Sequence, residues 1–168
     1  MTFKVELVQK EDAQAMLSYL KEVGSETNFL LFGAEGVGLS IEEEMNVLDS
    51  FSKTPYKKMY VVKDDSKIIA TAHIQLHTKD RTKHKSSIGI SVLKAYWNQG
   101  VGSMLIKTLI DYAKSTGITE TIYLEVLSNN HKAIGLYEKF GFYTYAVDKR
   151  STNIDNEYFD NNLMRLDL

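Results

Sequence analysis

The residues with the clearest chemical meaning form a glycine-containing turn between two apolar segments. Gly100 and Gly102 follow an apolar stretch that ends at Leu93, and the apolar residues after the turn recur at the spacing of one helix face: Met104, Leu105, Leu109, Ile110 and Ala113. The pattern predicts a helix whose first backbone N–H groups have no intrahelical partner. Such donors, together with the positive end of the helix dipole, suit a pyrophosphate group.

Other phosphate-binding patterns fit this turn poorly. A P-loop needs a lysine before its Ser or Thr, whereas Gly102 precedes Ser103. A dinucleotide fingerprint needs a third glycine where Leu105 stands, and an acidic residue closing the next strand, whereas Glu125 lies inside its segment. A lone Gly-x-Gly pair also fits a plain strand-to-helix turn in which glycine relieves crowding, so a second signal is needed.

The second signal lies about thirty residues downstream, in the segment Asn129–Phe142. Its pattern, Asn-x-x-Ala-x-x-Leu-Tyr-x-Lys-x-Gly-Phe, resembles a segment of the Gcn5-related N-acetyltransferase (GNAT) superfamily, and the turn resembles that family's acetyl-CoA motif, Arg/Gln-x-x-Gly-x-Gly/Ala. The two segments keep the family's order and separation over about Ile88 to Phe142. The resemblance implies an acyltransferase that passes acetyl from acetyl-CoA to a primary amine, on a small molecule or a protein N-terminus. The amine would attack directly, in a ternary complex.

The resemblance also implies which residues hold acetyl-CoA. In the family the pantetheine arm pairs with the fourth strand, and a backbone N–H at a bulge in that strand, placed here at Val92, faces the thioester oxygen. Small residues at 100 and 102 are expected to let the backbone approach the phosphates. Trp97 departs from the pattern, because it replaces an Arg or Gln at the start of the motif. The implied coenzyme-binding residues are Ile90, Ser91, Val92, Trp97, Asn98, Gln99, Gly100, Val101, Gly102, Ser103, Asn130, Ala133 and Tyr137.

The reaction also needs an acid and a base, because an alkyl amine with a pKa of about 10.4 is protonated at pH 7. The resemblance assigns Tyr137 as the general acid for the leaving thiolate. The glutamate that acts as base in some family members falls, by counting back from the turn, at Ser86, which cannot replace it. Glu26 and Glu125 are the remaining candidates, although a solvated loop charge and a structural ion pair explain them at least as well.

Composition limits the class of protein. The 168 residues are 43% hydrophobic and 25% charged, which suits one folded domain over residues 1–168. A net charge of −2 and the lack of a long apolar run argue against nucleic-acid and membrane partners and favour a cytoplasmic protein. The absence of cysteine excludes an acyl-cysteine intermediate. His73 and His77 share a strand face but lack a third ligand, so no metal site is expected.

Hydrophobic periodicity predicts an α/β (α+β) fold, with a mixed central sheet of about seven strands flanked by about four helices, in the order of the single-domain GNAT fold. The expected strands are 3–8, 60–62, 68–76, 87–93, 121–127, 142–148 and 158–168, the expected helices are 10–23, 41–52, 100–115 and 130–140, and 24–38 is expected to be a shaped loop. Dimers are common for such folds, so a homodimer is possible. A non-catalytic acyl-CoA-binding regulatory domain and a coenzyme-free dimer scaffold stay open as alternatives.

Overall fold

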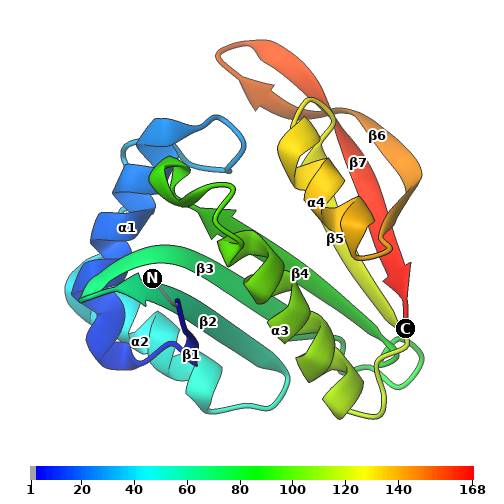
Figure 1. Cartoon of the computed structure of the whole chain (residues 1–168), viewed down its shortest axis with the longest axis horizontal. Helices are drawn as coiled ribbons and strands as arrows, with labels where there is room; N and C mark the ends of the chain where they lie inside the picture. The colour runs from blue at the N-terminus through cyan, green and yellow to red at the C-terminus, as the bar shows by residue number, and fades with distance from the viewer. Residues whose placement is uncertain (1–2) are drawn as a thin grey trace.

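A mixed seven-stranded sheet runs through the molecule (Figure 1). The computed structural model describes residues 3–168. The strand order is β1-β2-β3-β4-β5-β7-β6, and all neighbours are antiparallel except β4 and β5, which are parallel. The strands are β1 (Val5–Leu7), β2 (Lys57–Asp64), β3 (Lys67–Leu76), β4 (Lys85–Val92), β5 (Thr121–Leu127), β6 (Tyr143–Ile154) and β7 (Glu157–Asp167). The helices are α1 (Ala13–Glu26), α2 (Ile41–Ser52), α3 (Val101–Ser115) and α4 (His131–Lys139), with short 3-10 turns η1 (Lys10–Asp12) and η2 (Lys94–Tyr96). The predicted fold class and element order are confirmed.

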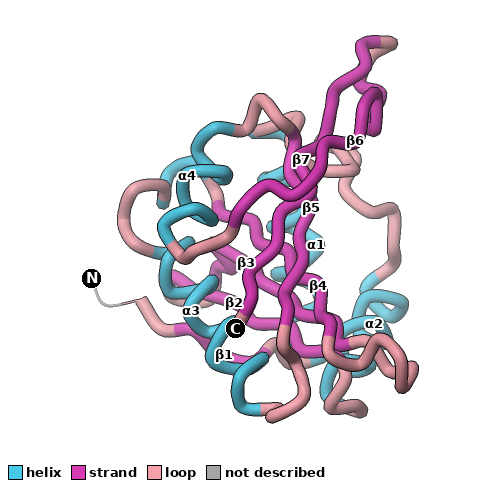
Figure 2. Tube along the Cα trace, turned by 90° about the vertical axis from the view of Figure 1, so that its right-hand side faces the viewer, coloured by secondary structure: helices cyan, strands magenta, loops and turns pink. Residues whose placement is uncertain are grey.

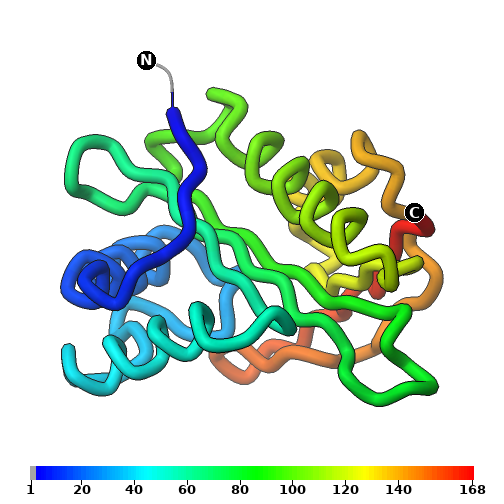
Figure 3. The backbone as a smooth tube through the Cα atoms, turned by 90° about the horizontal axis from the view of Figure 1, so that it is seen from below, coloured from blue at the N-terminus to red at the C-terminus, as the bar shows by residue number. Residues whose placement is uncertain are grey.

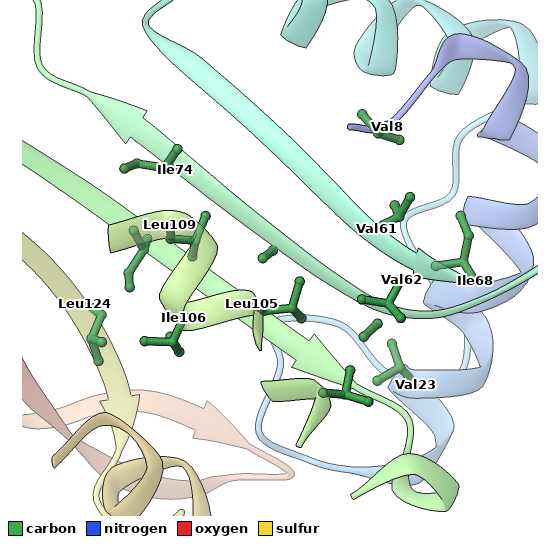
Figure 4. Close-up of a cluster of buried hydrophobic side chains, with 14 of the residues drawn as sticks. Val8, Val23, Val61, Val62, Ile68, Ile74, Leu105, Ile106, Leu109 and Leu124 are labelled. Carbon is green, nitrogen blue, oxygen red and sulfur yellow. The ribbon is translucent and has the colours of Figure 1, made fainter. Parts of the chain in front are cut away.

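Helices cover both faces of the sheet. Figure 3 shows α1 and α2 on one side and α3 and α4 on the other. The apolar stripe of α3, which includes Leu105, Ile106 and Leu109, is fully buried against the sheet, as the close-up in Figure 4 shows. Each such leucine or isoleucine contributes about 1.5–3 kcal/mol through its burial, so this packing fixes the position of the turn that precedes α3.

Local sequence signals set the bounds of α2 as predicted. The Ser40 hydroxyl accepts a hydrogen bond from the Glu43 N–H at 3.2 Å, and the Glu43 carboxylate accepts one from the Ser40 N–H at 2.8 Å. This reciprocal pair satisfies two of the backbone donors that a helix start leaves open. The helix therefore begins at Ile41, as the Ser-x-x-Glu spacing indicates.

Other predicted bounds are wrong where tertiary contacts override local pattern. Helix α1 runs to Glu26, so residues 24–26 do not belong to the loop. A Cβ on Gly24 would lie 2.1 Å from the Gly33 carbonyl oxygen, so this glycine lets the loop pack on the helix and does not end it. Strand β6 extends to Ile154, beyond the apolar alternation, because pairing with β7 continues into the polar hairpin that protrudes in Figure 2.

Two serines of β4 lie on opposite faces of the sheet. The Ser91 hydroxyl is hydrogen-bonded to the hydroxyls of Tyr19, at 2.7 Å, and Thr71, at 3.0 Å, which ties α1 to the sheet. The Ser86 hydroxyl is completely buried on the other face and has no hydrogen-bond partner within residues 3–168. Because a buried polar atom without a partner destabilises the fold, the two hydroxyls have opposite energetic roles.

Ser91→Ala is expected to lower the free energy of unfolding by about 1–3 kcal/mol, because it leaves the buried Tyr19 hydroxyl without its partner. Ser86→Ala is the matched control in the same strand, and we expect it to leave that free energy unchanged or to raise it. Urea unfolding followed by circular dichroism measures both. Equal losses in the two variants would contradict this assignment.

Candidate active site

Strands β4 and β5 pair only at their beginnings. The pairs are Lys85 with Thr121, Ser86 with Ile122 and Ser87 with Tyr123, and beyond them the strands diverge (Figure 1). The diverging stretches, Ile88–Val92 of β4 and Leu124–Leu127 of β5, are termed the fork. It opens on the side where α3 begins.

Backbone groups of β4 point into the fork at every second residue. The Leu93 N–H donates to the Ile69 carbonyl and the His77 N–H donates to the Lys85 carbonyl, both at 3.0 Å, which fixes the phase of the β3–β4 ladder. Odd-numbered β4 residues, including Ser91, therefore direct their backbone groups to β3. Ile90 and Val92 direct theirs into the fork.

The bulge expected in the fourth strand at Val92 is absent from the described β3–β4 ladder. Its register runs without a shift from Ala70 opposite Val92 to Leu76 opposite Ser86. Strand divergence alone, without an inserted residue, thus exposes the Val92 N–H. The prediction that this N–H faces the fork does not depend on a bulge.

Trp97 closes the end of the fork. Its indole N–H donates to the Val92 carbonyl at 2.7 Å, so the tryptophan ties the end of β4 to the segment that leads into α3. The Lys132 ammonium lies 4.5 Å from the centre of the indole ring, which is the geometry of a cation–π contact. Lys132 therefore brings a positive charge from α4 to the position where the motif lacks its arginine.

The glycine turn has the backbone of an anion cradle. Asn98 and Gly100 have left-handed backbone conformations, with φ of +61° and +84°. Gly100 is the N-cap of α3 and offers no side chain, so the N–H groups of the first helical turn have no partner within the helix. Consecutive N–H groups in such a turn converge on one point, where an anion is stabilised. The side-chain amide of Gln99 donates to the Ala95 carbonyl at 2.8 Å and braces the turn.

The two glycines of the turn have different surroundings. A Cβ on Gly102 would lie 2.9 Å from Leu136 Cδ2, so this glycine allows α3 to pack closely on α4. A Cβ on Gly100 would meet nothing within 4 Å, but the positive φ there is unfavourable for other residues. Helix packing favours glycine at 102 and backbone conformation favours it at 100, while the expectation that small residues here let the backbone approach a phosphate stays a prediction.

Helix α4 adds a cap and a buried tyrosine. Asn130 accepts the Ala133 N–H at 3.2 Å, the N-cap bond that the sequence predicts. Tyr137 is 5% exposed and its ring lies 5.8 Å from that of Phe142. Burial raises the pKa of Tyr137 to about 12, and its hydroxyl forms no hydrogen bond within residues 3–168. The phenol therefore stays protonated at neutral pH.

The carboxylates considered as bases have distinct environments. The Glu26 carboxylate accepts the Lys94 N–H at 2.8 Å, which joins the end of α1 to the segment before the glycine turn. Glu125 is exposed on β5, two residues beyond Tyr123, and so points to the same face as Ser87 and Ser91. That face, on which α1 packs, is termed the α1 face.

Ser86 lies outside the fork. Its hydroxyl is buried beneath α3, on the face opposite Glu125, and its neighbour on β5 is Ile122. A glutamate there would be buried on the face of the sheet opposite Glu125. The prediction that the family's glutamate position falls at Ser86 therefore places that position away from the α1 face.

The sequence predicts no catalytic role for His73, which lies on the α1 face. His73 lies opposite Gly89, and a Cβ on that glycine would be 2.5 Å from the imidazole Cε1. The ring therefore rests on the β4 backbone beside the fork. An imidazole covering a glycine of the neighbouring strand is a signal that only strand register reveals.

Aromatic and cationic groups continue the α1 face beyond the fork. Tyr123 makes an edge-on contact with Tyr145 at 5.8 Å, and the Lys85 ammonium lies 5.5 Å from the Tyr123 ring. A separate hollow of about 470 Å³ lies on the outer side of α1, lined by Gln14 and Lys21 among others, and shares no residue with the fork.

Comparison with known proteins identifies the family. The sequence model of the acetyltransferase (GNAT) family matches residues 26–142. This chain belongs to the GNAT acetyltransferase family. It is 28% identical over 106 residues to the L-amino acid N-acetyltransferase AaaT of Escherichia coli (strain K12), a match that spans 63% of this chain and 65% of that relative.

Solved structures of GNAT proteins share the whole fold. The acetyltransferase of the GNAT family from Streptococcus pneumoniae superposes with a TM-score of 0.93 at 26% identity, over 99% of this chain and 100% of that one. The yncA acetyltransferase of Salmonella typhimurium, solved with acetyl-CoA, superposes with a TM-score of 0.84 at 16% identity, over 100% and 95% of the two chains. The second likeness is one of fold.

Within residues 3–168, no three His, Asp or Glu side chains are grouped to hold a metal ion. None of the described helices combines the length and apolar character needed to cross a membrane.

Gly100→Ala is expected to lower the free energy of unfolding by about 1–2 kcal/mol, because an L-residue is strained at positive φ. Gly135→Ala is the matched control, since a Cβ in the middle of α4 meets nothing within 4 Å; it should raise that free energy by about 0.5–1 kcal/mol. Thermal unfolding of both variants checks the pair. A stabilising Gly100→Ala would refute the conformational reason.

Proposed function

We propose that this protein is an acetyl-CoA-dependent N-acetyltransferase that transfers acetyl to a primary amine by direct attack in a ternary complex. The observation that carries the proposal is the continuity of the fork with the glycine turn. Backbone groups of Ile90 and Val92 and the unpaired N–H groups at the start of α3 form one line of donors and acceptors. An extended amide-containing arm that ends in a pyrophosphate fits this line.

The chain's own groups divide the binding task. The Val92 N–H, nearer the glycine turn, would pair with the pantetheine arm. The Ile90 N–H, farther from the turn, would donate to the thioester oxygen as negative charge develops on it, in place of the Val92 N–H that the resemblance implies. The first turn of α3 would hold the pyrophosphate, with Lys132 supplying a positive charge that Trp97 keeps in place. Acetyl-CoA supplies the activated acetyl group.

Tyr137 would serve as the general acid. As the bond from the carbonyl carbon to sulfur breaks, the sulfur gains charge and accepts the phenolic proton. A phenol whose pKa is raised to about 12 by burial remains protonated throughout the neutral range, so it is ready to donate.

The two candidate carboxylates have different prospects as bases. The Glu26 carboxylate accepts a hydrogen bond from the Lys94 N–H. Glu26 would therefore position the segment before the glycine turn. Glu125 lies on the α1 face across the fork from Gly89, where an amine would approach. The regulatory alternative rested on Ser86, and the placement of that serine under α3 gives it no support.

The acceptor is proposed to be an α-amino group, on an amino acid or at a protein N-terminus. The named substrate of the Escherichia coli relative is an L-amino acid, and this supports the choice. The first experiment is acetyl-CoA binding by calorimetry, followed by a thiol-release assay with L-amino acids, alkylamines and a peptide with N-terminal alanine. Binding with thiol release supports the proposal, and no binding contradicts it.

Lys132→Glu is expected to weaken acetyl-CoA binding at least tenfold, because it places a negative charge beside the proposed pyrophosphate position. Lys139→Glu, at the far end of α4, carries the same charge change and should alter the affinity less than threefold. Calorimetry at one salt concentration compares them. Equal weakening by both variants would show a general charge effect and contradict the cradle.

Tyr137→Phe is expected to lower kcat by about 10²-fold or more, since a positioned proton donor contributes about 10²–10⁴ to the rate. The acetyl-CoA dissociation constant should stay within about twofold of the wild type, because the aromatic packing on Phe142 is retained. Thiol release and calorimetry measure the two quantities. An unchanged kcat would exclude the tyrosine as the acid.

A further inference from the structure

An acceptor amine must lose protons on the α1 face, since acetyl-CoA would occupy the α3 side of the fork. An alkylammonium with a pKa of about 10.4 cannot attack until it is deprotonated. Asp and Glu are weak bases for this purpose at neutral pH, because their pKa values lie near 4. A group whose pKa lies nearer to neutral would be a better matched base.

His73 lies beside the reacting end of the fork. It is opposite Gly89 in the β3–β4 ladder, and Gly89 directly precedes Ile90, whose backbone faces the fork. A Cβ on Gly89 would lie 2.5 Å from the imidazole Cε1 and 3.1 Å from Nε2, so the Cε1 end of the ring occupies the space beside the glycine. The glycine makes the room that the ring occupies.

The His73 ring is free to exchange protons. It forms no hydrogen bond or ion pair within residues 3–168, and its side chain keeps an exposed surface on the α1 face. The last pair between β4 and β5 is Ser87 with Tyr123. Gly89 and Glu125 each lie two residues beyond that pair, so Glu125 is on β5 at the same distance from the start of the fork as Gly89 is on β4. An imidazole and a carboxylate thus flank the fork from β3 and β5.

Other titratable groups lie around this part of the α1 face. They are Tyr19 and Glu26 of α1, the buried Glu44 of α2, Lys57 of β2, Lys85 of β4, Tyr123 and Glu125 of β5, and Tyr145 of β6. Lys57 donates to the Ser50 hydroxyl, and the Tyr19 hydroxyl is bonded to Ser91. Packing against the strands, rather than a neighbouring charge, lowers the pKa of His73 from its usual value.

We propose that His73 is the proton acceptor for the amine, a role that rests on the proposed acetyltransferase function. The neutral imidazole takes a proton from the ammonium and passes it to solvent. The amine nitrogen then bonds to the acetyl carbon, the second proton goes to His73, and the carbon–sulfur bond breaks as Tyr137 protonates sulfur. Solvent returns a proton to Tyr137 and removes one from His73, so an ammonium and acetyl-CoA yield an amide, free CoA and one proton.

The test compares His73→Gln, Glu125→Gln and the control His77→Gln, which lies just beyond the same strand. The amine is the member of the panel of L-amino acids, alkylamines and N-terminal-alanine peptide that the wild type acetylates fastest. For His73→Gln, kcat/KM at pH 7 should fall about 10²–10⁴-fold. It should recover as the pH rises and more free amine is present, and acetyl-CoA affinity should stay within about twofold. The wild-type fall in kcat/KM below the His73 pKa should be absent from that variant.

Gly89→Ala provides a second variant that keeps the imidazole. The added Cβ would overlap the ring at 2.5 Å and displace it, so kcat/KM should fall at least tenfold while acetyl-CoA still binds. Wild-type kcat/KM and pH profile in His73→Gln, or a loss confined to Glu125→Gln, would overturn the role of His73. Wild-type protein that releases no thiol with any amine would instead refute the proposed function, and this role with it.

Discussion

The structure depends on one constraint: backbone N–H and C=O groups inside a sheet need partners. Strands β4 and β5 meet this constraint for three pairs and then separate, so the inner edge of β4 carries unpaired groups in the middle of the molecule. Such an edge costs free energy unless water or a ligand satisfies it. The fork is therefore a place where internal pairing is lost, and in the proposed function acetyl-CoA satisfies the unpaired groups of β4.

Single contacts from distant parts of the chain hold the fork open. The Trp97 indole N–H donates a hydrogen bond to the Val92 carbonyl, so this carbonyl at the end of β4 cannot pair with β5. Glu26, at the end of α1, fixes the Lys94 N–H, and Lys132 of α4 lies over the indole. Contacts from two helices, α1 and α4, thus converge on the segment between β4 and α3.

The sheet separates two chemical environments. On the α3 face, buried Tyr137 keeps its proton, as a donor should. On the α1 face, His73 and Glu125 are exposed, as groups that exchange protons with solvent should be. In the proposed mechanism the fork is the passage between them, so acid and base act on the reacting atoms from opposite sides. That arrangement follows from the alternation of side chains along β4 and β5.

Residue types at short spacing were enough to predict the family, the order of elements, the glycine turn before α3 and the cap at Asn130, because each of these depends on local sequence. Only the tertiary structure decided which face each strand residue occupies. Register placed Ser86 under α3, His73 on Gly89 and Glu125 beside the fork, and none of these follows from counting along the chain. Packing between elements decided why Gly102 is a glycine, through Leu136, and how far α1 extends. Local pattern encodes local hydrogen bonding, whereas the neighbours of a side chain are set by segments far away in sequence.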